Sequence, residues 1–287
     1  MTDFGGAIQK GPDCDVAIIG IPYDEKSSYL KGPAKGPQAI REASTSKMIN
    51  AWTELGVNLE TDIKMMDFGD MDVGGPFSEV FSRIEEKIET VLSNEVVPVI
   101  LGGDHSISYP IVKAFWRKYG CLDILDFDAH ADLYDKLYGD RFSHACPFAR
   151  IMEDGLAQNV VQVGIRTANE EHRKQAEKYN VRMIEMKDFD DSLALEFPNP
   201  LYISFDLDAL DPAFAPGVSH YEAGGLSTRQ VVNILHRLKA DIVGLDVVEV
   251  NPDREKSGIT AAAAVKVIKE VIGKIVFDRK KKNKEET

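Results

Sequence analysis

The sequence has few cysteines and no long apolar run. Its 287 residues include only Cys14, Cys121 and Cys146, which cannot all pair within one chain and show no CxxC spacing typical of thiolate zinc sites. No stretch approaches the roughly 20 apolar residues that a membrane-spanning helix needs, and the amino-terminal segment lacks the basic-then-apolar order of a signal peptide. We therefore expect a soluble, cytoplasmic protein with reduced thiols and no membrane association.

Positive charge is also scarce. The chain has 34 Lys and Arg residues against 47 Asp and Glu residues, which gives a net charge of -13. This balance repels nucleic-acid phosphates and anionic membrane surfaces, so we expect neither as a partner. It is compatible with a small cationic substrate.

No linker, internal repeat or low-complexity block divides the chain, so we expect a single domain over residues 1–287. Short β-branched runs alternate with segments of helical periodicity, as in βαβ units. This pattern predicts an α/β fold with a mostly parallel eight-stranded sheet and helices on both faces. The predicted strands are Val16–Gly20, Met65–Phe68, Val96–Leu101, Leu122–Phe127, Val160–Gly164, Val181–Ile184, Leu201–Asp206 and Ile242–Val248. The predicted helices are Phe77–Leu92, Ile107–Tyr119, Asn169–Tyr179, Thr228–Lys239 and Thr260–Val276, with Ser78, Asn169 and Ser227 near three of their starts.

Four predicted strands end in polar residues that a simple turn would not require. The segments are GGDHS (102–106), DFDAHAD (126–132), DLDALD (206–211) and EVNP (249–252). Ligands of parallel sheets bind beyond the carboxyl ends of the strands, where the loops converge. These segments therefore indicate where the functional site lies.

The spacing of the acidic residues predicts a metal site. Alternate residues of an extended segment point the same way, so Asp128, His130 and Asp132 can converge with Asp206 and Asp208, and His105 can join them. Four carboxylates placed together without cations would repel one another, whereas two divalent metals remove that conflict. His and Asp ligands without a thiolate favour Mn²⁺ over Zn²⁺ or Mg²⁺. Taken singly, His105 could be a structural histidine, and Gly102–Gly103 could form a tight turn or a phosphate-binding loop.

At these residues the sequence resembles the ureohydrolase family of arginases and agmatinases. GGDHS, DFDAHAD and SFDLDALDP (204–212) match the family's signatures, and GIPYDEKSSYLKGPAKGPQAIR (20–41) resembles its amino-terminal segment. The resemblance covers essentially the whole chain and implies an arginase-like three-layer sandwich, one ureohydrolase domain, and a trimeric or hexameric homo-oligomer. It also implies one metal bound by His105, Asp128, Asp132 and Asp206, and a second bound by His130, Asp128, Asp206 and Asp208.

The resemblance implies roles for two further residues. Glu249 would accept hydrogen bonds from a substrate guanidinium, and His144, in FSHACPF (142–148), would transfer protons near the site. Cys146 lies two residues from His144, which leaves a cysteine nucleophile as an alternative. His220 lies in APGVSHYEAGG (215–225), where the family more often has a Thr-Gly-Thr-Pro-like stretch. His172 and His236 fall in predicted amphipathic helices, and we expect both on the surface.

The expected activity is hydrolysis of a guanidino compound to urea and an amine. A hydroxide activated by two Mn²⁺ ions would attack the guanidinium carbon, and Asp128 or His144 would deliver a proton to the departing amine. SHACPF resembles the agmatinase form, so agmatine is the predicted substrate, with putrescine as the product, as in polyamine biosynthesis. Arginase, guanidinobutyrase and formimidoylglutamase activities are alternatives. A metal-binding regulatory or scaffold protein is the non-enzymatic alternative.

Overall fold

The computed structural model describes residues 3–7, 13–47 and 49–285. The amino-terminal segment that argues against a signal peptide includes residues 1–2 and 8–12, which lie outside the described residues. Within the described ranges, none of the helices combines the length and apolarity that a membrane crossing requires.

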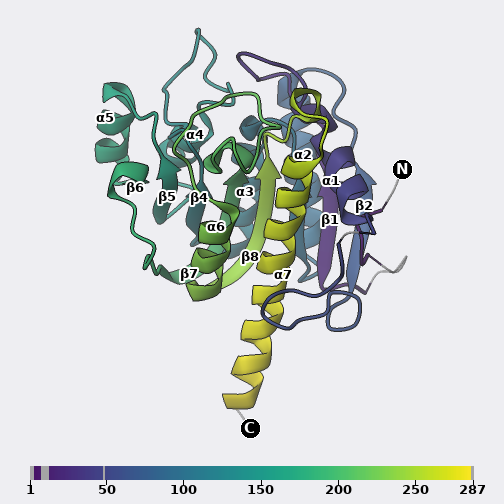
Figure 1. The fold of residues 1–287 in the computed structure, drawn as a ribbon. Helices are drawn as coiled ribbons and strands as arrows, with labels where there is room; N and C mark the ends of the chain where they lie inside the picture. Colours follow the sequence, from purple (N-terminus) through teal and green to yellow (C-terminus); the bar gives the residue numbers. More distant parts are fainter. Residues whose placement is uncertain (1–2, 8–12, 48, 286–287) are drawn as a thin grey trace.

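A parallel eight-stranded sheet forms the centre of the fold. All neighbouring strands pair in parallel, in the order β2-β1-β3-β8-β7-β4-β5-β6 (Figure 1). Every residue of β1, β3 and β4 is buried, because helices cover both faces of the sheet. The eight predicted strands are confirmed, although β7 begins five residues before its predicted start. The strands are β1 Val16–Gly20, β2 Met65–Asp70, β3 Val97–Leu101, β4 Asp123–Phe127, β5 Asn159–Ile165, β6 Arg182–Glu185, β7 Glu196–Asp206 and β8 Lys239–Val248.

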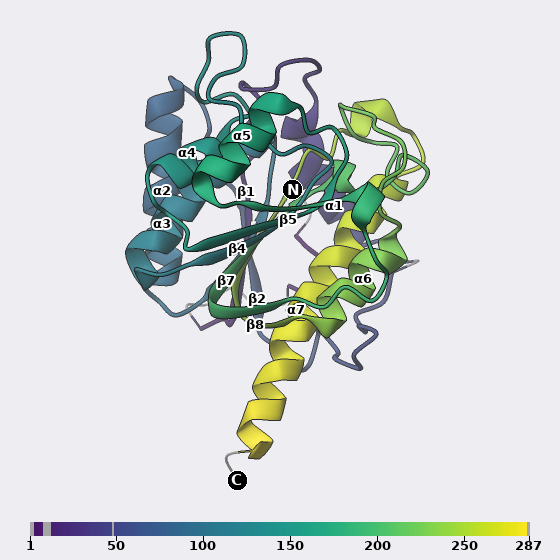
Figure 2. The same cartoon turned by 90° about the vertical axis from the view of Figure 1, so that its left-hand side faces the viewer.

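Helices cover both faces of this sheet, which makes three layers (Figure 2). One face carries α1 Gly36–Ser44, α6 Thr228–Arg237 and α7 Ile259–Glu285, whose apolar side chains share one core with the sheet. The other carries α2 Phe77–Leu92, α3 Ser108–Tyr119, α4 Pro147–Glu153 and α5 Glu170–Tyr179, around a second core. The five predicted helices are present. Helices α1 and α4 were not predicted, because nine and seven residues are too few to show a clear helical period.

Two of the three residues predicted near helix starts cap their helices. Asn169 and Ser227 each form a capping box with the third residue of their helix, His172 and Gln230. Ser78 also lies near a helix start, as predicted. Helix α2 begins at Phe77 after Pro76, and the Ser78 side chain does not cap it.

The sheet order brings the polar segments together. Strands β3, β8, β7 and β4 are consecutive neighbours, and in a parallel sheet their carboxyl ends lie at the same edge. The segments after these four strands carry the predicted site residues. Chain positions more than 140 residues apart, such as His105 and Glu249, therefore become adjacent.

Candidate metal centre

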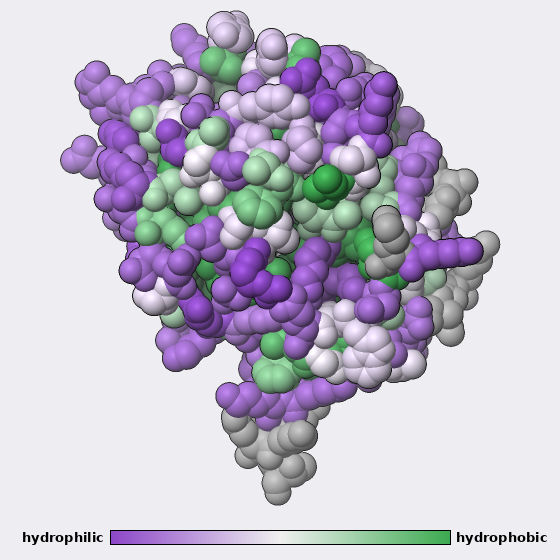
Figure 3. Space-filling model, in the orientation of Figure 1, coloured by the Kyte–Doolittle hydropathy of each residue, from purple (hydrophilic) through white to green (hydrophobic). Residues whose placement is uncertain are grey.

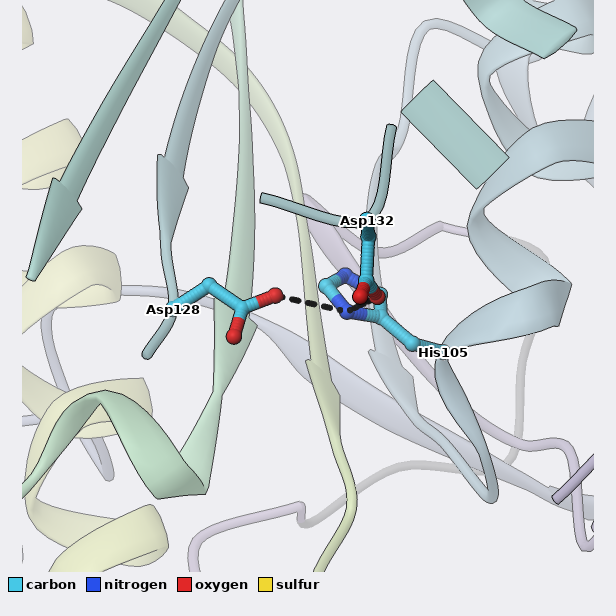
Figure 4. A group of neighbouring side chains, drawn as sticks. All are labelled: His105, Asp128 and Asp132. Atoms are coloured by element: carbon cyan, nitrogen blue, oxygen red, sulfur yellow. Dashed lines mark ion pairs between the residues drawn. The ribbon is translucent and has the colours of Figure 1, made fainter. Parts of the chain in front are cut away.

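His105 lies at the centre of the predicted site. It begins a short 3-10 helix, His105–Ile107, which three residues separate from the end of β3 at Leu101, and its side chain is fully buried. Its Nδ1 atom lies 3.1 Å from Asp132 Oδ2, 3.3 Å from Asp128 Oδ2 and 3.4 Å from Asp206 Oδ2. Figure 4 shows the imidazole directed at Asp128 and Asp132. One ring nitrogen therefore faces three carboxylates.

The other ring nitrogen of His105 is held by a chain of two buried hydrogen bonds. His105 Nε2 lies 2.9 Å from Ser204 Oγ, which donates to Asp246 Oδ1 at 2.7 Å. Since the Ser204 hydroxyl donates its only proton to the carboxylate, it accepts the bond from His105 Nε2–H. In a neutral ring the Nδ1 lone pair is then directed at the carboxylates. Metal-binding histidines are commonly oriented in this way, by a hydrogen bond from the ring nitrogen that does not bind the metal.

His130 and Asp128 form a second group beside the first. His130 Nδ1 lies 3.1 Å from Asp208 Oδ2 and 3.5 Å from Asp128 Oδ1. Asp128 therefore directs one carboxylate oxygen at each histidine. The potential ligand atoms of His105, Asp128 and Asp132 lie within 4.8 Å of one another, and so do those of Asp128, His130 and Asp208.

The six predicted ligands thus converge, but not through alternation along an extended strand. Strand β4 ends at Phe127, before Asp128, and Asp132 has a left-handed backbone with φ 48°. Asp206 is the last residue of β7, and its carboxylate accepts the backbone N–H of Asp208 at 2.8 Å in the 3-10 helix Leu207–Ala209. Tight turns, rather than strand periodicity, aim these side chains at one point.

The electrostatics of the cluster fit divalent cations. Burial, together with repulsion from Asp132 and Asp208, raises the pKa of Asp128 to about 6. Burial and the neighbouring carboxylates raise the pKa of Asp206 well above its ordinary value. His105 Nδ1 and Asp128 Oδ2 are buried without a hydrogen-bond partner among the described residues. Two divalent cations would provide both atoms with a partner and offset the four negative charges.

Glu249 lies beside the cluster, directly after β8. It has a left-handed backbone with φ 61°, a conformation that costs about 1–2 kcal/mol for a residue with a side chain. Its Oε1 accepts the His105 N–H at 3.1 Å and lies 2.9 Å from His144 Nδ1. Its Oε2 is buried with no partner among the described residues. One oxygen is thus fixed by the protein, and the other is available to a ligand.

His144 bridges Glu249 and the loop after β1, because its Nε2 lies 2.9 Å from Ser28 Oγ. Burial lowers the pKa of His144, but the bond to Glu249 and nearby carboxylates outweigh this effect and raise it to about 9.

The thiol of Cys146 is not suited to act as a nucleophile. Burial raises the pKa of its thiol to about 12, so the thiolate that a cysteine nucleophile requires is disfavoured.

A cavity of about 220 Å³ lies beside these groups. His130, Asp132, His144, Asp206, Asp208, His220 and Glu249 contribute to its walls. Its other lining residues were not assigned from the sequence, and they are Ser28, Tyr134, Leu137, Ala145, Thr167 and His172. Most of these residues lie in loops, where sequence periodicity gives no signal.

The prediction that His172 and His236 are surface residues was wrong for His172. Its side chain is only 3% exposed, because the capping box turns it back over Asn169 and against the ring of Tyr134. His236 is half-buried and lies 2.8 Å from Glu270 Oε2. His220, in the unusual 215–225 segment, contacts the rings of His130 and His144 across the cavity.

Glycine and arginine hold the surrounding loops. A Cβ atom on Gly103 would lie 1.9 Å from the Tyr23 carbonyl oxygen, so this position requires glycine for close backbone approach. Arg166 donates hydrogen bonds to backbone carbonyls of Asp208, Leu210 and Glu222, among others. It therefore joins the turn that carries Asp208 to the 215–225 segment that carries His220.

Comparison with known proteins identifies similar chains. A family model described as the arginase family matches residues 14–273. Arginase 1, mitochondrial, of Arabidopsis thaliana is 45% identical over 281 residues, which cover 92% of this chain and 82% of that protein. The structure of the arginase from Medicago truncatula superposes with a TM-score of 0.87 at 42% identity, covering 91% of this chain and 87% of that one. A structure described as a hypothetical agmatinase from Burkholderia thailandensis gives a TM-score of 0.84 at 31% identity, covering 98% and 92%.

Proposed function

This chain belongs to the arginase family, and we propose that it hydrolyses a linear guanidino compound to urea and an amine. The observation that carries the proposal is the convergence of two imidazoles and four carboxylates beside the His144–Glu249 pair, at one cavity. We further propose that residues 1–287 form a single ureohydrolase domain.

The proposed metal ligands are the six converging side chains. His105, Asp128, Asp132 and Asp206 would bind one ion, and His130, Asp128, Asp206 and Asp208 would bind the other. Both ions would be Mn²⁺, which suits mixed carboxylate and imidazole ligands. When bound, such ions supply Lewis acidity that activates water near neutral pH.

The protein's own residues would bind the substrate and move protons. Glu249 Oε2, the oxygen without a protein partner, would accept hydrogen bonds from the guanidinium and orient it over the metal ligands. His144 would carry a proton between the cavity and the departing amine through its Nε2 atom, which Ser28 contacts. Asp128 is the other group proposed to deliver that proton.

L-Arginine is the substrate that we propose first, because proteins described as arginases are similar to this chain along most of its length. Agmatine, the substrate predicted from SHACPF, is the second candidate and is supported by the similarity to a structure described as a hypothetical agmatinase. Guanidinobutyrate and formimidoylglutamate are further alternatives within the same chemistry. The reaction on agmatine would yield putrescine and place the enzyme in polyamine biosynthesis.

A homo-oligomer, a trimer or hexamer, is part of the proposal. Apolar residues gather over the middle of the face shown in Figure 3. Ile259 and Phe277 of α7 are 50% and 42% exposed, and a subunit interface over this helix would cover them. We also propose a cytoplasmic location, with a mitochondrial one as the alternative, given the name of the Arabidopsis relative.

A urea assay tests the proposed function. Purified protein loaded with Mn²⁺ would be incubated separately with L-arginine, agmatine and 4-guanidinobutyrate, with inorganic phosphate release from phosphate monoesters measured in parallel. We expect urea from at least one guanidino compound and no phosphate. Release of phosphate without urea would overturn the proposal in favour of a two-metal phosphoesterase. The absence of both products would favour a metal-binding regulatory protein.

A further inference from the structure

His144 is almost closed off from solvent. It is only 7% exposed, and the ring of His220 lies against its own ring, with the two centroids 5.2 Å apart. A side chain that transfers protons must also exchange them with its surroundings. The contacts of its two ring nitrogens therefore decide the route by which His144 gains and loses a proton.

Glu249 holds the first of these nitrogens. Glu249 Oε1 lies 2.9 Å from His144 Nδ1 and also accepts the backbone N–H of His105 at 3.1 Å. Because an ionised carboxylate can only accept hydrogen bonds, Nδ1 carries a proton in both the neutral and the charged ring. The ring therefore gains and loses its second proton at Nε2.

Ser28 is the group that contacts Nε2. Its Oγ lies 2.9 Å from that atom, and within the described ranges the hydroxyl has no second hydrogen-bond partner. A serine hydroxyl can donate and accept, so it accepts the Nε2 proton of a charged ring and donates to the lone pair of a neutral one. Ser28 is thus matched to both forms of His144.

The charged form of His144 leaves the Ser28 proton free. Burial lowers the pKa of His144, but its bond to Glu249 outweighs this effect and raises the pKa to about 9, so the charged ring prevails near pH 7. In this form Ser28 Oγ accepts from Nε2, and its own proton is directed elsewhere. Ser28 lines the cavity, so a ligand in the cavity can accept that proton.

Ser28 lies at the open end of the cavity, because it is exposed whereas Glu249 is buried. The nitrogen that departs from a guanidino compound carries the rest of the substrate chain. With the other two nitrogens directed at Glu249, this substituted nitrogen faces the open end. Ser28 is therefore on the side of the cavity where the departing amine needs a proton.

Three hydrogen bonds hold the Ser28 loop against the segment that carries His144. The His144 N–H donates to the Lys26 carbonyl at 3.2 Å, and Lys26 Nζ lies 2.7 Å from Asp140 Oδ2. The buried carboxylate of Asp104 accepts the Lys26 N–H at 2.9 Å. These bonds fix the backbone two residues before Ser28, so the contact between Ser28 and His144 is built into the fold.

From these contacts we propose that Ser28 is a catalytic residue whose hydroxyl passes the Nε2 proton of His144 to the departing amine. The inference rests on the proposed function. The Oγ–H proton moves to the substituted nitrogen as Oγ takes the proton of His144 Nε2. The carbon–nitrogen bond breaks with its electron pair on nitrogen, the amine leaves, and the protonated urea loses its proton to water. His144 then regains a proton from solvent through the same hydroxyl.

Ser28→Ala tests this assignment with whichever of L-arginine, agmatine and 4-guanidinobutyrate the wild type hydrolyses fastest. We expect kcat to fall about tenfold, because mobile water replaces a fixed hydroxyl, and KM to change less than about threefold. The ratio of kcat in H2O to kcat in D2O should increase, since proton transfer then limits the rate more fully. Ser28→Thr keeps a hydroxyl and should retain kcat within about threefold of the wild type. Circular dichroism and elemental analysis should show that both variants are folded and keep the wild-type content of Mn²⁺.

Ser27→Ala is the matched control, because Ser27 donates to Asp104 Oδ2 at 3.3 Å and is not among the described residues that line the cavity. Its kcat and isotope ratio should equal those of the wild type. Unchanged kcat in Ser28→Ala would overturn the assignment and favour Asp128 as the proton donor. A lower kcat with an unchanged isotope ratio, or equal losses in Ser28→Thr and Ser28→Ala, would also overturn it, because Ser28 would then only shape the loop.

Failure of this inference can be distinguished from failure of the proposed function. In every outcome that overturns the role of Ser28, the wild type still releases urea. Absence of urea from the wild type with all three guanidino compounds would instead refute the proposed function.

Discussion

At the scale of single residues, the ring of His105 has two different surroundings. Ser204 and Asp246 hold its Nε2, whereas its Nδ1 faces Asp128, Asp132 and Asp206. The same division holds for Glu249, with one oxygen bonded to the protein and the other unpaired. In each side chain the protein therefore holds one polar atom by hydrogen bonds. The second polar atom, Nδ1 of His105 or Oε2 of Glu249, remains for a ligand.

Asp128→Asn and Glu249→Gln each remove one buried carboxylate from the site. We expect the first to reduce metal binding and the second to reduce activity without loss of metal. Asp128 lies between both histidines, so its variant should lose at least one Mn²⁺ per chain and about a hundredfold or more in urea release. The amide in Glu249→Gln would retain an oxygen for the His105 N–H, so that variant should keep both ions and lose about tenfold or more in kcat/KM. Elemental analysis and a urea assay of both proteins measure these effects.

Each of these variants serves as the control for the other. Retention of two ions by Asp128→Asn would contradict its assignment as a shared ligand. Loss of metal from Glu249→Gln would place Glu249 among the metal ligands, contrary to its assignment as a guanidinium-binding residue.

Sequence reasoning identified most of the side chains that converge in the structure, because they belong to local motifs. The six proposed ligands, His144 and Glu249 all follow strands or lie in long motifs, and all are brought together at one edge of the sheet. His172 was missed because its burial depends on the Asn169 cap and on Tyr134, which is 38 positions away in the chain. No pattern within α5 distinguishes such a residue from one on a solvated helix face.

At the scale of elements, Arg166 connects two segments of the candidate site. Its guanidinium donates to carbonyls of the turn that carries Asp208 and to Glu222 of the 215–225 segment. Arg166→Lys keeps the positive charge but loses the planar guanidinium, which can donate to several carbonyl oxygens at once. We expect the affinity for the more weakly held Mn²⁺ to fall about tenfold while the other ion is retained, as measured by isothermal titration calorimetry.

Arg229→Lys provides the comparison for Arg166, because Arg229 is an exposed residue of α6 that bonds Glu54 and lies outside the cavity. Its Mn²⁺ affinities should equal those of the wild type. Unchanged affinities in Arg166→Lys as well would show that Arg166 does not position the Asp208 turn.

The Arg173–Glu185 pair joins α5 to β6 and supports the helix that carries His172. The bond to Arg173 lowers the pKa of Glu185 from 4.5 to about 2. Because the folded state holds the ionised form, its stabilisation is present above about pH 4.5 and is lost as the pH falls toward 2. Because Arg173 is exposed to solvent, we expect this stabilisation to be small. Urea denaturation of wild type and Glu185→Gln should show a difference at pH 7 that narrows toward pH 3.

Glu177→Gln is the control for this pH dependence, since Glu177 is an exposed carboxylate of the same helix. Its stability should follow that of the wild type at each pH. A difference between wild type and Glu185→Gln that widened on acidification would contradict the assigned direction of the pKa shift.

At the scale of the whole molecule, the sequence predicted which segments are strands but not the strand order in the sheet, which brings the site residues together. Apolar runs and β-branched residues were enough to identify all eight strands and five helices. The order β2-β1-β3-β8-β7-β4-β5-β6 depends on how helices pack on both faces, which no local pattern contains. The short helices α1 and α4 were missed because they have too few residues to show a clear helical period. The left-handed turns at Asp132 and Glu249 were missed because no local pattern contains them.

The number of metal ions per chain tests the central claim most directly. In the proposed centre, two cations share a cage with Asp128 between them, and the cage consists of His105, Asp128, His130, Asp132, Asp206 and Asp208. Purified protein would be stripped with a chelator, dialysed against Mn²⁺ and measured by elemental analysis beside a urea assay. We predict two ions per chain, with urea release restored as the second ion binds. Full urea release with one ion per chain, or with none, would contradict the proposed two-metal centre.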